Sequence, residues 1–559
     1  MASTTPSAAG SSSTPSNPFA ANEEFHKYYE KLFKLLRERK PEDKPRIVVY
    51  TDIEQDYDDL LTVIFLAEMH RLGALELAGF VANHHPALER AMFLRTVLHL
   101  LNLSHIPVAV GTAGVQGVEK ILDNDSEDTK QAKIRKTKEA LNKHAPDFYY
   151  GLKNRTFRNA PWNKNKNDFP SGKELVDKLA NSERPLTVLL ISTLQDISEY
   201  FTKTDPKSLR DNFSKFVSQG GYEVTTQANG AVKLAPVADM MNNKFHPTHA
   251  ANYTNYLANL KLRSDAWSRE AAKASKLPGT FMKDLFQYGP IGAHLEWMWM
   301  RLEFKFYWDP FNWPFMPNLD PGWYLNTRLG MPRGTDQFNK LKDTAVPFTY
   351  AAPNIQVIVY DCCAAVGAVG DDFMRAMGVM VPENEVPAYN RAAHGHRVFG
   401  KDAKEPALGG VRGPVLREVM QAFIMGGLRS TYKKAQATPG FQKIQHDTTS
   451  YRFGVDAFLN DLLPLLKAEA AHLSNAQQYT KDASKAEEEG KKADAQRLLG
   501  LAAKEKKEAA ELCQKLLRVS KTDMKNRPTR DDIPYEALYQ KAMQSIGQGK
   551  RPAGGAGGK

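Results

Sequence analysis

The sequence predicts an α/β protein built on a doubly wound, mostly parallel sheet, with helical extensions at both ends. Short apolar runs rich in valine, isoleucine and leucine recur roughly every 25 to 30 residues, and helix-like segments separate them. Polar and acidic residues follow several of these runs directly. Ligands bind at that position in open α/β sheets, at the carboxyl ends of the strands.

Six segments are expected to form strands, because each is short, apolar and bounded by polar or turn-forming residues. They are residues 47–50, 75–81, 106–110, 186–191, 213–217 and 355–360. Helical periodicity lies between them, at residues 60–67, 88–101 and 196–201.

At 559 residues the chain can bury a large core, and we expect one α/β body with appendages. An amphipathic helix over 23–39 precedes the first strand, and a stretch over 469–519 rich in Ala, Lys, Glu and Leu predicts a helical hairpin or coiled coil with Gly490 near its turn. The expected divisions are a disordered tail at 1–22, the α/β domain at 23–454 with insertions near 115–170 and 280–350, a helical extension at 455–545 and a flexible tail at 546–559.

The composition is that of a soluble protein, 42% hydrophobic and 25% charged, with a net charge of +11. The basic run 130–144 is interpreted as a solvated helix face rather than a nucleic-acid patch. Three cysteines form no disulfide framework, the first residues lack a secretory signal pattern, and no run of 18 apolar residues predicts a membrane span. We therefore expect a cytoplasmic protein without membrane partners.

The first strand runs directly into a dense acidic stretch. The segment RIVVYTDIEQDYDDLLTVIFL contains Asp52, Glu54, Asp56, Asp58 and Asp59 within eight residues. Carboxylates so close repel one another unless a cation, a sugar hydroxyl or solvent takes up the charge. The stretch predicts either a hard-cation site with oxygen ligands or an acid/base site.

Three other kinds of structure also carry acidic residues close together: a helix N-terminus, an EF-hand loop and the nucleophile loop of a phosphatase. A solvated helix N-terminus favours acidic residues through the macrodipole, but five acids after a buried strand, with Asp361 after another, favour a site. An EF-hand loop begun at Asp52 would have Tyr57 at its glycine position and Val63 at its closing glutamate. A phosphatase of the haloacid-dehalogenase type fits worse, because Glu54 and Asp56 depart from its nucleophile loop.

The stretch Asp52-Ile-Glu54-Gln-Asp56-Tyr-Asp58-Asp59 resembles the Asp-x-Asp-x-Gly-x-Asp-Asp signature of the inosine/uridine-preferring nucleoside hydrolases. Further segments resemble this family in the same order along residues 46–440. They are Asn83 after the second strand, IPVAVG at 106–111, LLISTLQDISEYF at 189–201, GGYEV at 220–224, PVADMMNN at 236–243 and the VYDCCAAVGAV segment that contains Asp361.

The resemblance implies calcium-dependent hydrolysis of the N-glycosidic bond of ribonucleosides. It places Glu54, Asp59, Asp361 and the carbonyl of Thr193 around the calcium ion. A water would be deprotonated by Glu54 or Asp56, with Tyr360 assisting departure of the base. The residues expected to hold the ribose hydroxyls are Asp58, Asn83, Asp239 and Asn242. A homo-oligomer is also expected.

Three positions depart from the family pattern. Glu54 stands where the family has an aspartate that binds calcium and acts as the base, Asp56 replaces a glycine, and Tyr360 replaces a histidine that helps protonate the leaving base. A carboxylate displaced by about 1 Å can lose about 100-fold in rate. The alternative prediction is therefore an inactive relative that binds a nucleoside, or a scaffold that assembles through the aromatic insertion and the C-terminal helices.

Overall fold

The computed structural model describes most of the chain between residues 16 and 522. The described ranges are 16–119, 124–144, 155–163, 168–182, 184–228, 230–312, 320–341, 354–381, 395–400, 408–436 and 475–522, with residues 122, 165, 441, 444, 468, 471 and 472. The predicted disorder of residues 1–15, the predicted helix beyond 522 and the flexible tail 546–559 fall outside these ranges.

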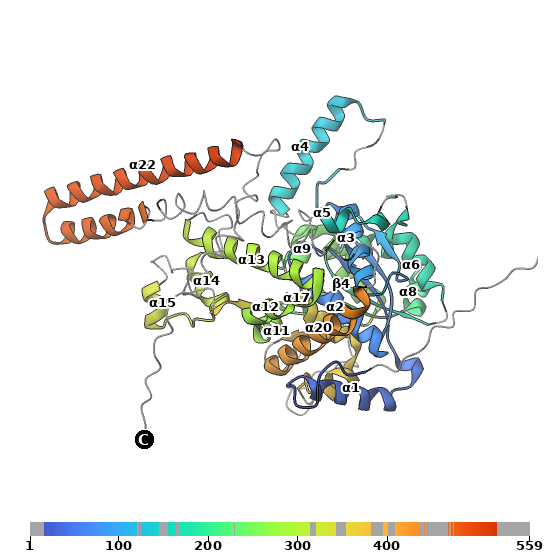
Figure 1. Cartoon of the computed structure of the whole chain (residues 1–559). Helices are drawn as coiled ribbons and strands as arrows, with labels where there is room; N and C mark the ends of the chain where they lie inside the picture. The colour runs from blue at the N-terminus through green and yellow to red at the C-terminus, as the bar shows by residue number, and fades with distance from the viewer. Residues whose placement is uncertain are drawn as a thin grey trace, which may run out of the picture.

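The body is organised around an eight-stranded sheet in the order β12-β11-β8-β5-β4-β1-β2-β3 (Figure 1). Every neighbouring pair of its strands is parallel. The strands are β1 Arg46–Thr51, β2 Glu76–Ala82, β3 Val108–Val110, β4 Leu186–Ile191, β5 Phe213–Gln219, β8 Ser264–Trp267, β11 His396–Gly400 and β12 Leu408–Gly410. The doubly wound parallel sheet predicted from the sequence is thus present.

Helices cover both faces of this sheet, and β1 shows why. Its residues Ile47 and Val49 join one hydrophobic core, whereas Val48 and Tyr50 join the other. Side chains alternate across a strand, so a strand with two buried faces must be apolar at every position.

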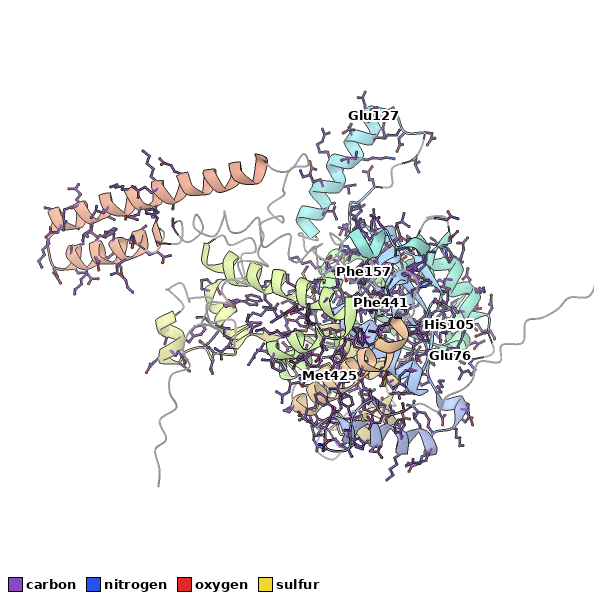
Figure 2. All side chains as sticks on the ribbon, in the orientation of Figure 1. Glu76, His105, Glu127, Phe157, Met425 and Phe441 are labelled. Atoms are coloured by element: carbon purple, nitrogen blue, oxygen red, sulfur yellow. The ribbon has the colours of Figure 1, made fainter. Side chains whose placement is uncertain are left out.

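The first and larger core lies under helices on one face of the sheet. They include α1 His26–Glu38, α2 Asp58–Leu72, α3 Ala87–Leu100, α11 Arg269–Ala274, α12 Gly279–Leu285, α17 Tyr360–Val369, α18 Asp371–Met377 and α20 Gly413–Ala435. The second core lies under helices that include α6 Gly172–Ala180, α7 Gln195–Lys203, α8 Pro206–Asn212 and α10 Pro247–Leu260. In Figure 2 the side chains crowd through this body, where Phe157 and Met425 are labelled.

Two differences from the sequence prediction concern the number and position of the strands. The predicted strand 355–360 is wrong in length and place, because only β10, Gln356–Val357, is extended, and it pairs antiparallel with β9, Leu277–Pro278, outside the main sheet. Tyr360 instead begins helix α17. Conversely, β8, β11 and β12 were not predicted, because they are short and carry charged residues or glycine.

The described residues of the two predicted insertions are mostly helical. The first holds α4 Glu127–His144 and α5 Arg155–Arg158, and α4 projects from the body in Figure 1 and begins at the labelled Glu127 in Figure 2. The second holds α13 Gly289–Asn312, α14 Pro321–Thr327 and α15 Asp336–Leu341. Between them lie the hairpin of β6 Tyr222–Thr226 with β7 Val232–Pro236, and α9 Met241–Phe245.

The C-terminal part forms the expected helical hairpin. A helix over 475–488 is followed by α22, Lys492–Thr522, and Gly490 lies in the turn between them with φ of 75°. Figure 1 shows the pair extending away from the sheet. In the part of the chain that the structure describes, no helix combines the length and apolarity needed to cross a bilayer.

Candidate functional site

The carboxyl ends of β1 and β4 mark the point where the sheet reverses its winding. From β1 the strand order continues through β2 and β3 in one direction, and from β4 through β5 and β8 in the other. The two loops that leave β1 and β4 therefore diverge, and this point is the usual ligand position in such sheets. The acidic stretch and Thr193 follow these two strands.

Five carboxylates meet at this edge. Asp52 follows β1, Asp56 lies in the loop, Asp58 and Asp59 form the first turn of α2, and Asp361 lies in the first turn of α17. One carboxylate oxygen from each of Asp56, Asp58 and Asp59 lies within 4.8 Å of the others. Four of the five are buried, and Asp56 is partly exposed.

The buried carboxyls hold their protons more tightly than ordinary aspartates. Burial, together with the opposing effects of Arg90 and Asp56, raises the pKa of Asp52 to about 7. Burial and then the charge of Asp56 raise the pKa of Asp58 well above its usual range. The pKa values of Asp59 and Asp361 are likewise raised well above that range by burial and by neighbouring carboxylates. Burial, and then repulsion among the carboxylates, thus disfavours their charged forms in the free protein.

A fully buried arginine, Arg90 of α3, lies beneath the acidic loop. Its Nη1 donates to the carbonyls of Asp52 and Ile53, at 2.6 Å in the second case, and its Nη2 donates to Oε1 of Gln55 at 2.9 Å. Its hydrogen bonds therefore fix the backbone of the loop. Its charge also favours ionisation of Asp52 and Asp59, but one cation cannot balance five carboxylates.

The donor set suits a hard divalent cation. Calcium takes six to eight oxygens, mainly from carboxylates, backbone carbonyls and water. Asp58 and Asp59 are held in place, since Oδ2 of Asp58 accepts from the backbone amides of Tyr360 at 3.0 Å and Asp361 at 3.4 Å, and Thr51 donates its hydroxyl to Asp59. The three clustered carboxylates and Asp361 thus form an oxygen-rich, preorganised group.

Glu54 is directed away from this group, toward the second insertion. Its Oε2 lies 2.7 Å from Nε2 of His294 on α13, and both side chains are fully buried. Its backbone has a φ of 74°, a left-handed conformation that non-glycine residues adopt rarely. Its Oε1 is buried and has no hydrogen-bond partner among the described residues. The structure therefore pairs Glu54 with His294 instead of placing it beside the other acids.

The same inserted segment also contacts Tyr57, three residues after Glu54 in the loop. Tyr57 donates its hydroxyl to Oε1 of Glu303 at 3.1 Å, and Arg328 lies 3.2 Å from that oxygen and 3.3 Å from the Tyr57 hydroxyl. All three side chains are buried, and burial raises the pKa of Glu303. The insertion over 280–350 is therefore packed onto the acidic loop through two buried polar contacts.

Asn83 and Thr193 come together, as expected from their positions after β2 and β4. Nδ2 of Asn83 donates to the carbonyl of Thr193 at 3.3 Å and to Oδ2 of Asp196 at 2.9 Å, while its Oδ1 accepts from the Ser192 hydroxyl at 2.5 Å. Thr193 donates its hydroxyl to the carbonyl of Gly114 at 2.7 Å. These bonds orient the Thr193 carbonyl, whose second lone pair is available to an ion, but they engage the whole Asn83 amide.

The remaining predicted residues lie at the edge of the site. Asn242 is buried and donates to Oε1 of Gln219, the last residue of β5, at 3.0 Å. Asp239 is 64% exposed and forms an ion pair with Arg269 at 2.5 Å. Tyr360 is partly buried, and burial raises its pKa to about 12, with Asp58 and Asp56 acting in the same direction and Arg328 and Arg269 opposing the rise.

Sequence reasoning missed the partners supplied by distant segments. These are Arg90, His294, Glu303 and Arg328, which are buried beside the acidic loop. No spacing relates them to Glu54 or Tyr57, because α13 lies more than 200 residues further along the chain. Ser192 and Asp196 were within the segment LLISTLQDISEYF, and their position directly after a strand was a usable signal.

Comparisons with known proteins support the fold. Similar solved structures include the type III effector protein XopQ complexed with adenosine diphosphate ribose, at 18% identity over 72% of this chain and 99% of that chain, with a TM-score of 0.53. The effector protein XOO4466 is also similar, at 18% identity over 72% of this chain and 99% of that one, with a TM-score of 0.52. A purine-preferring ribonucleoside hydrolase from Gardnerella vaginalis aligns over 69% of this chain and 99% of its own, at 13% identity and a TM-score of 0.39.

No model of a protein family matches the chain, and no curated protein matches it in sequence. At 18% identity the likeness to the two effector proteins shows a shared fold alone. The doubly wound α/β fold expected from the sequence is therefore confirmed, and these two effector proteins share it.

Proposed function

We propose that this chain binds a calcium ion and a ribonucleoside at the carboxyl edge of its sheet and hydrolyses the N-glycosidic bond to ribose and free base. The observation that carries the proposal is the convergence of five carboxylates at the reversal point of the sheet, around one buried arginine. The ordered resemblance to nucleoside hydrolases supports the same conclusion. Membership of the inosine/uridine-preferring group is part of the proposal.

Asp58, Asp59 and Asp361, with the Thr193 carbonyl, are the proposed ion ligands. Asp58 and Asp361 belong to different helices but are joined by the backbone amides at the start of α17. When bound, a divalent cation lowers the pKa of water in its coordination shell and offsets the repulsion among the carboxylates. Asp58 would also face the ribose, in the role that the resemblance gives it.

Asp56 is the base that the geometry favours. It is the partly exposed member of the acidic group, and one of its oxygens lies within 4.8 Å of those of Asp58 and Asp59. In the proposed reaction Asp56 takes a proton from a water, the water oxygen bonds to C1′ of the ribose, and the bond from C1′ to the base nitrogen breaks. The departing base receives a proton, for which Tyr360 is the proposed donor, although its raised pKa makes it a weaker acid than a free tyrosine.

The same carboxylates would stabilise the transition state. Glycosidic cleavage develops positive charge on the sugar ring, and fixed negative groups close to that charge lower the barrier. The carboxylates repel one another in the free protein, and the positive charge that develops on the sugar ring in the transition state reduces this repulsion. The partly exposed pair of Asp239 and Arg269 and the buried Asn242 would lie at the ribose and base end of the site.

A second candidate function is nucleoside binding without turnover. The specific observation that favours it is the buried contact between Glu54 and His294, which occupies the residue at the family's base position. The second insertion, packed onto the acidic loop through Glu303 and Arg328, would then serve to close the site around a bound ligand. The two candidates share the ion site and differ in the chemical step.

The deciding experiment measures free ribose released from a panel of ribonucleosides, with calcium or with a chelator. Adenosine diphosphate ribose, which is bound in the XopQ structure, belongs in the panel as a ligand. We expect Asp56→Asn to lower turnover by about 100-fold or more and Asp59→Asn to abolish calcium binding. Asp211→Asn, a charge change at an exposed surface pair, is the matched control.

The outcomes separate the candidates. Ribose release that depends on calcium and on Asp56 supports hydrolysis. Retained nucleoside binding with no release in the wild-type chain supports the binder. Neither binding nor release would refute both, and assembly lost on removal of residues 455–559 would then favour a scaffold. Homo-oligomerisation and a cytoplasmic location remain proposals, and light scattering of the purified chain tests the first.

A further inference from the structure

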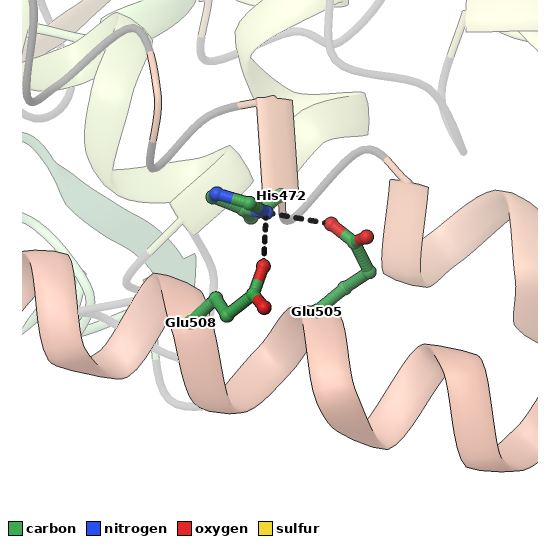
Figure 3. A group of neighbouring side chains, drawn as sticks. All are labelled: His472, Glu505 and Glu508. Carbon is green, nitrogen blue, oxygen red and sulfur yellow. Dashed lines mark hydrogen bonds and ion pairs between the residues drawn. The ribbon is translucent and has the colours of Figure 1, made fainter.

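A second group of metal-ligating side chains lies on the C-terminal helical hairpin, far along the chain from the acidic loop. His472 is itself helical and lies three residues before the helix over 475–488, and Glu505 and Glu508 project from α22 (Figure 3). Nδ1 of His472 lies 2.7 Å from Oε2 of Glu505 and 3.2 Å from Oε2 of Glu508. One ligand atom from each residue lies within 4.8 Å of the others.

The spacing of the two glutamates explains why they converge. Residues three apart on a helix lie on the same face, so Glu505 and Glu508 both point toward the neighbouring chain segment. His472 approaches that face from the other arm of the hairpin, and Figure 3 shows one nitrogen of its ring facing both carboxylates. Helix geometry and chain reversal together therefore bring three ligands to one point.

The contact is poorly explained as an ion pair alone. A histidine Nδ1 carries at most one proton, and that proton can make only one linear hydrogen bond, which the Glu505 oxygen at 2.7 Å accounts for. The second carboxylate at 3.2 Å adds mainly repulsion with the first. Lys504 reaches only 3.9 Å from the other oxygen of Glu508. A divalent cation would instead satisfy all three groups at once.

The distances are close to those of a tetrahedral site. Ligand atoms about 2.0 to 2.2 Å from a zinc ion lie roughly 3.4 Å from one another. The two nitrogen-to-oxygen distances, 2.7 and 3.2 Å, need only a small expansion to admit the ion. Asn475 lies on the same side, with its amide 3.3 Å from Oε2 of Glu505, so rotation of that amide would bring its oxygen forward as a fourth ligand.

The hairpin also has a thin apolar core that a metal would reinforce. Among the hairpin residues whose side chains the structure describes, the buried hydrophobic ones are alanines, each of which contributes a single methyl group. They are Ala476, Ala483, Ala486, Ala495, Ala502 and Ala509. A metal bridge from His472 to α22 would join the two arms near the end remote from the turn at Gly490, where fraying is otherwise easiest.

We propose that His472, Glu505 and Glu508 bind a divalent transition metal of borderline softness, with Zn²⁺ as the best match. The bound metal would hold the two arms of the helical hairpin together. The ligand set of one imidazole and two carboxylates is one that zinc accepts. This site is independent of the calcium proposed at the sheet edge, which has oxygen ligands only.

The test is zinc binding by the full chain, measured by calorimetry after chelator treatment and with calcium in excess to occupy the acidic site. We expect the wild-type chain to bind one zinc equivalent more than His472→Ala, and we expect Glu508→Gln to weaken that equivalent at least about tenfold. The control Glu488→Gln removes the same charge from an exposed position of the hairpin and should bind zinc normally.

Two further measurements keep the result unambiguous. Helical content by circular dichroism shows whether each variant keeps the hairpin, and Co²⁺ substitution reports tetrahedral coordination through its visible absorption. Asp59→Asn should retain the zinc equivalent, which separates this site from the proposed calcium site. Equal zinc uptake by the wild-type chain and His472→Ala, or equal loss in Glu488→Gln, would overturn the proposal and leave an ion pair only.

Discussion

The contact between Glu54 and His294 offers the sharpest test of how the second insertion controls the acidic loop. Both side chains are fully buried and their closest atoms are 2.7 Å apart. The His294 ring also packs against both rings of the stacked pair Phe93 and Phe157, with ring centroids 5.0 Å away in each case. Replacing Glu54 by Gln keeps its shape and removes its charge, and replacing His294 by Gln removes the ring.

Removal of one partner from a buried pair costs about 3 to 5 kcal/mol, because the other polar group stays buried without compensation. We expect each single variant to lose free energy of unfolding of that order. His294→Gln should be the more costly, since it also removes the ring contacts with both phenylalanines. The double variant should lose clearly less than the sum of the singles, because the pair is then absent rather than broken.

Urea unfolding of the four proteins, in the presence of a chelator, measures this cycle. The exposed pair of Lys207 and Asp211 supplies the control, and Asp211→Asn should leave the urea midpoint unchanged. Single variants that each cost less than about 1 kcal/mol, or effects that add without coupling, would refute the reasoning. Turnover that survives Glu54→Gln would in addition assign the base to Asp56.

Three other predictions follow from the same structure. In the folded chain the pKa of Asp52 is about 7, raised above its usual 3.8, so the folded chain binds more protons than the unfolded chain between these pH values. In the presence of a chelator, thermal stability should therefore rise as the pH falls from about 8 toward 5. Bound calcium should reduce this pH dependence. Tyr360→Phe should lower turnover while nucleoside affinity, measured by calorimetry, changes little, and equal turnover would exclude Tyr360 as a proton donor. Gly426→Ala should destabilise the fold, because its Cβ would lie 1.7 Å from the Tyr29 hydroxyl, whereas Gly500→Ala, with open space on α22, should be neutral or stabilising in the same melting assay.

The sequence alone determined the central part of the fold. The apolar runs that became β1, β2, β4 and β5 are buried on both faces, and such strands carry a continuous hydrophobic signal. The helical hairpin and its turn were also predictable, because both depend on residues close together in the sequence. The hairpin sequence is rich in helix-forming residues, and Gly490 readily adopts the positive φ that the turn requires.

The sequence could also place the acidic residues, because their position after β1 depends on local order along the chain. Parallel strands bring their carboxyl ends to one edge, so the sequence predicts that Asp58, Asp59 and Thr193 are neighbours. Asp361 was assigned correctly to this edge but through the wrong element, since it begins helix α17 instead of ending a strand.

Only the tertiary structure decided what surrounds those acids. The partners of Glu54 and Tyr57 come from α13 and the segment after α14, and such pairings depend on how an insertion folds back over the sheet. Edge strands β11 and β12 were hidden for a related reason, because they are short and their pairing is non-local. Local sequence fixes which residues end a strand, whereas the charge balance of a buried site is set by groups that only the complete fold brings within a few ångströms.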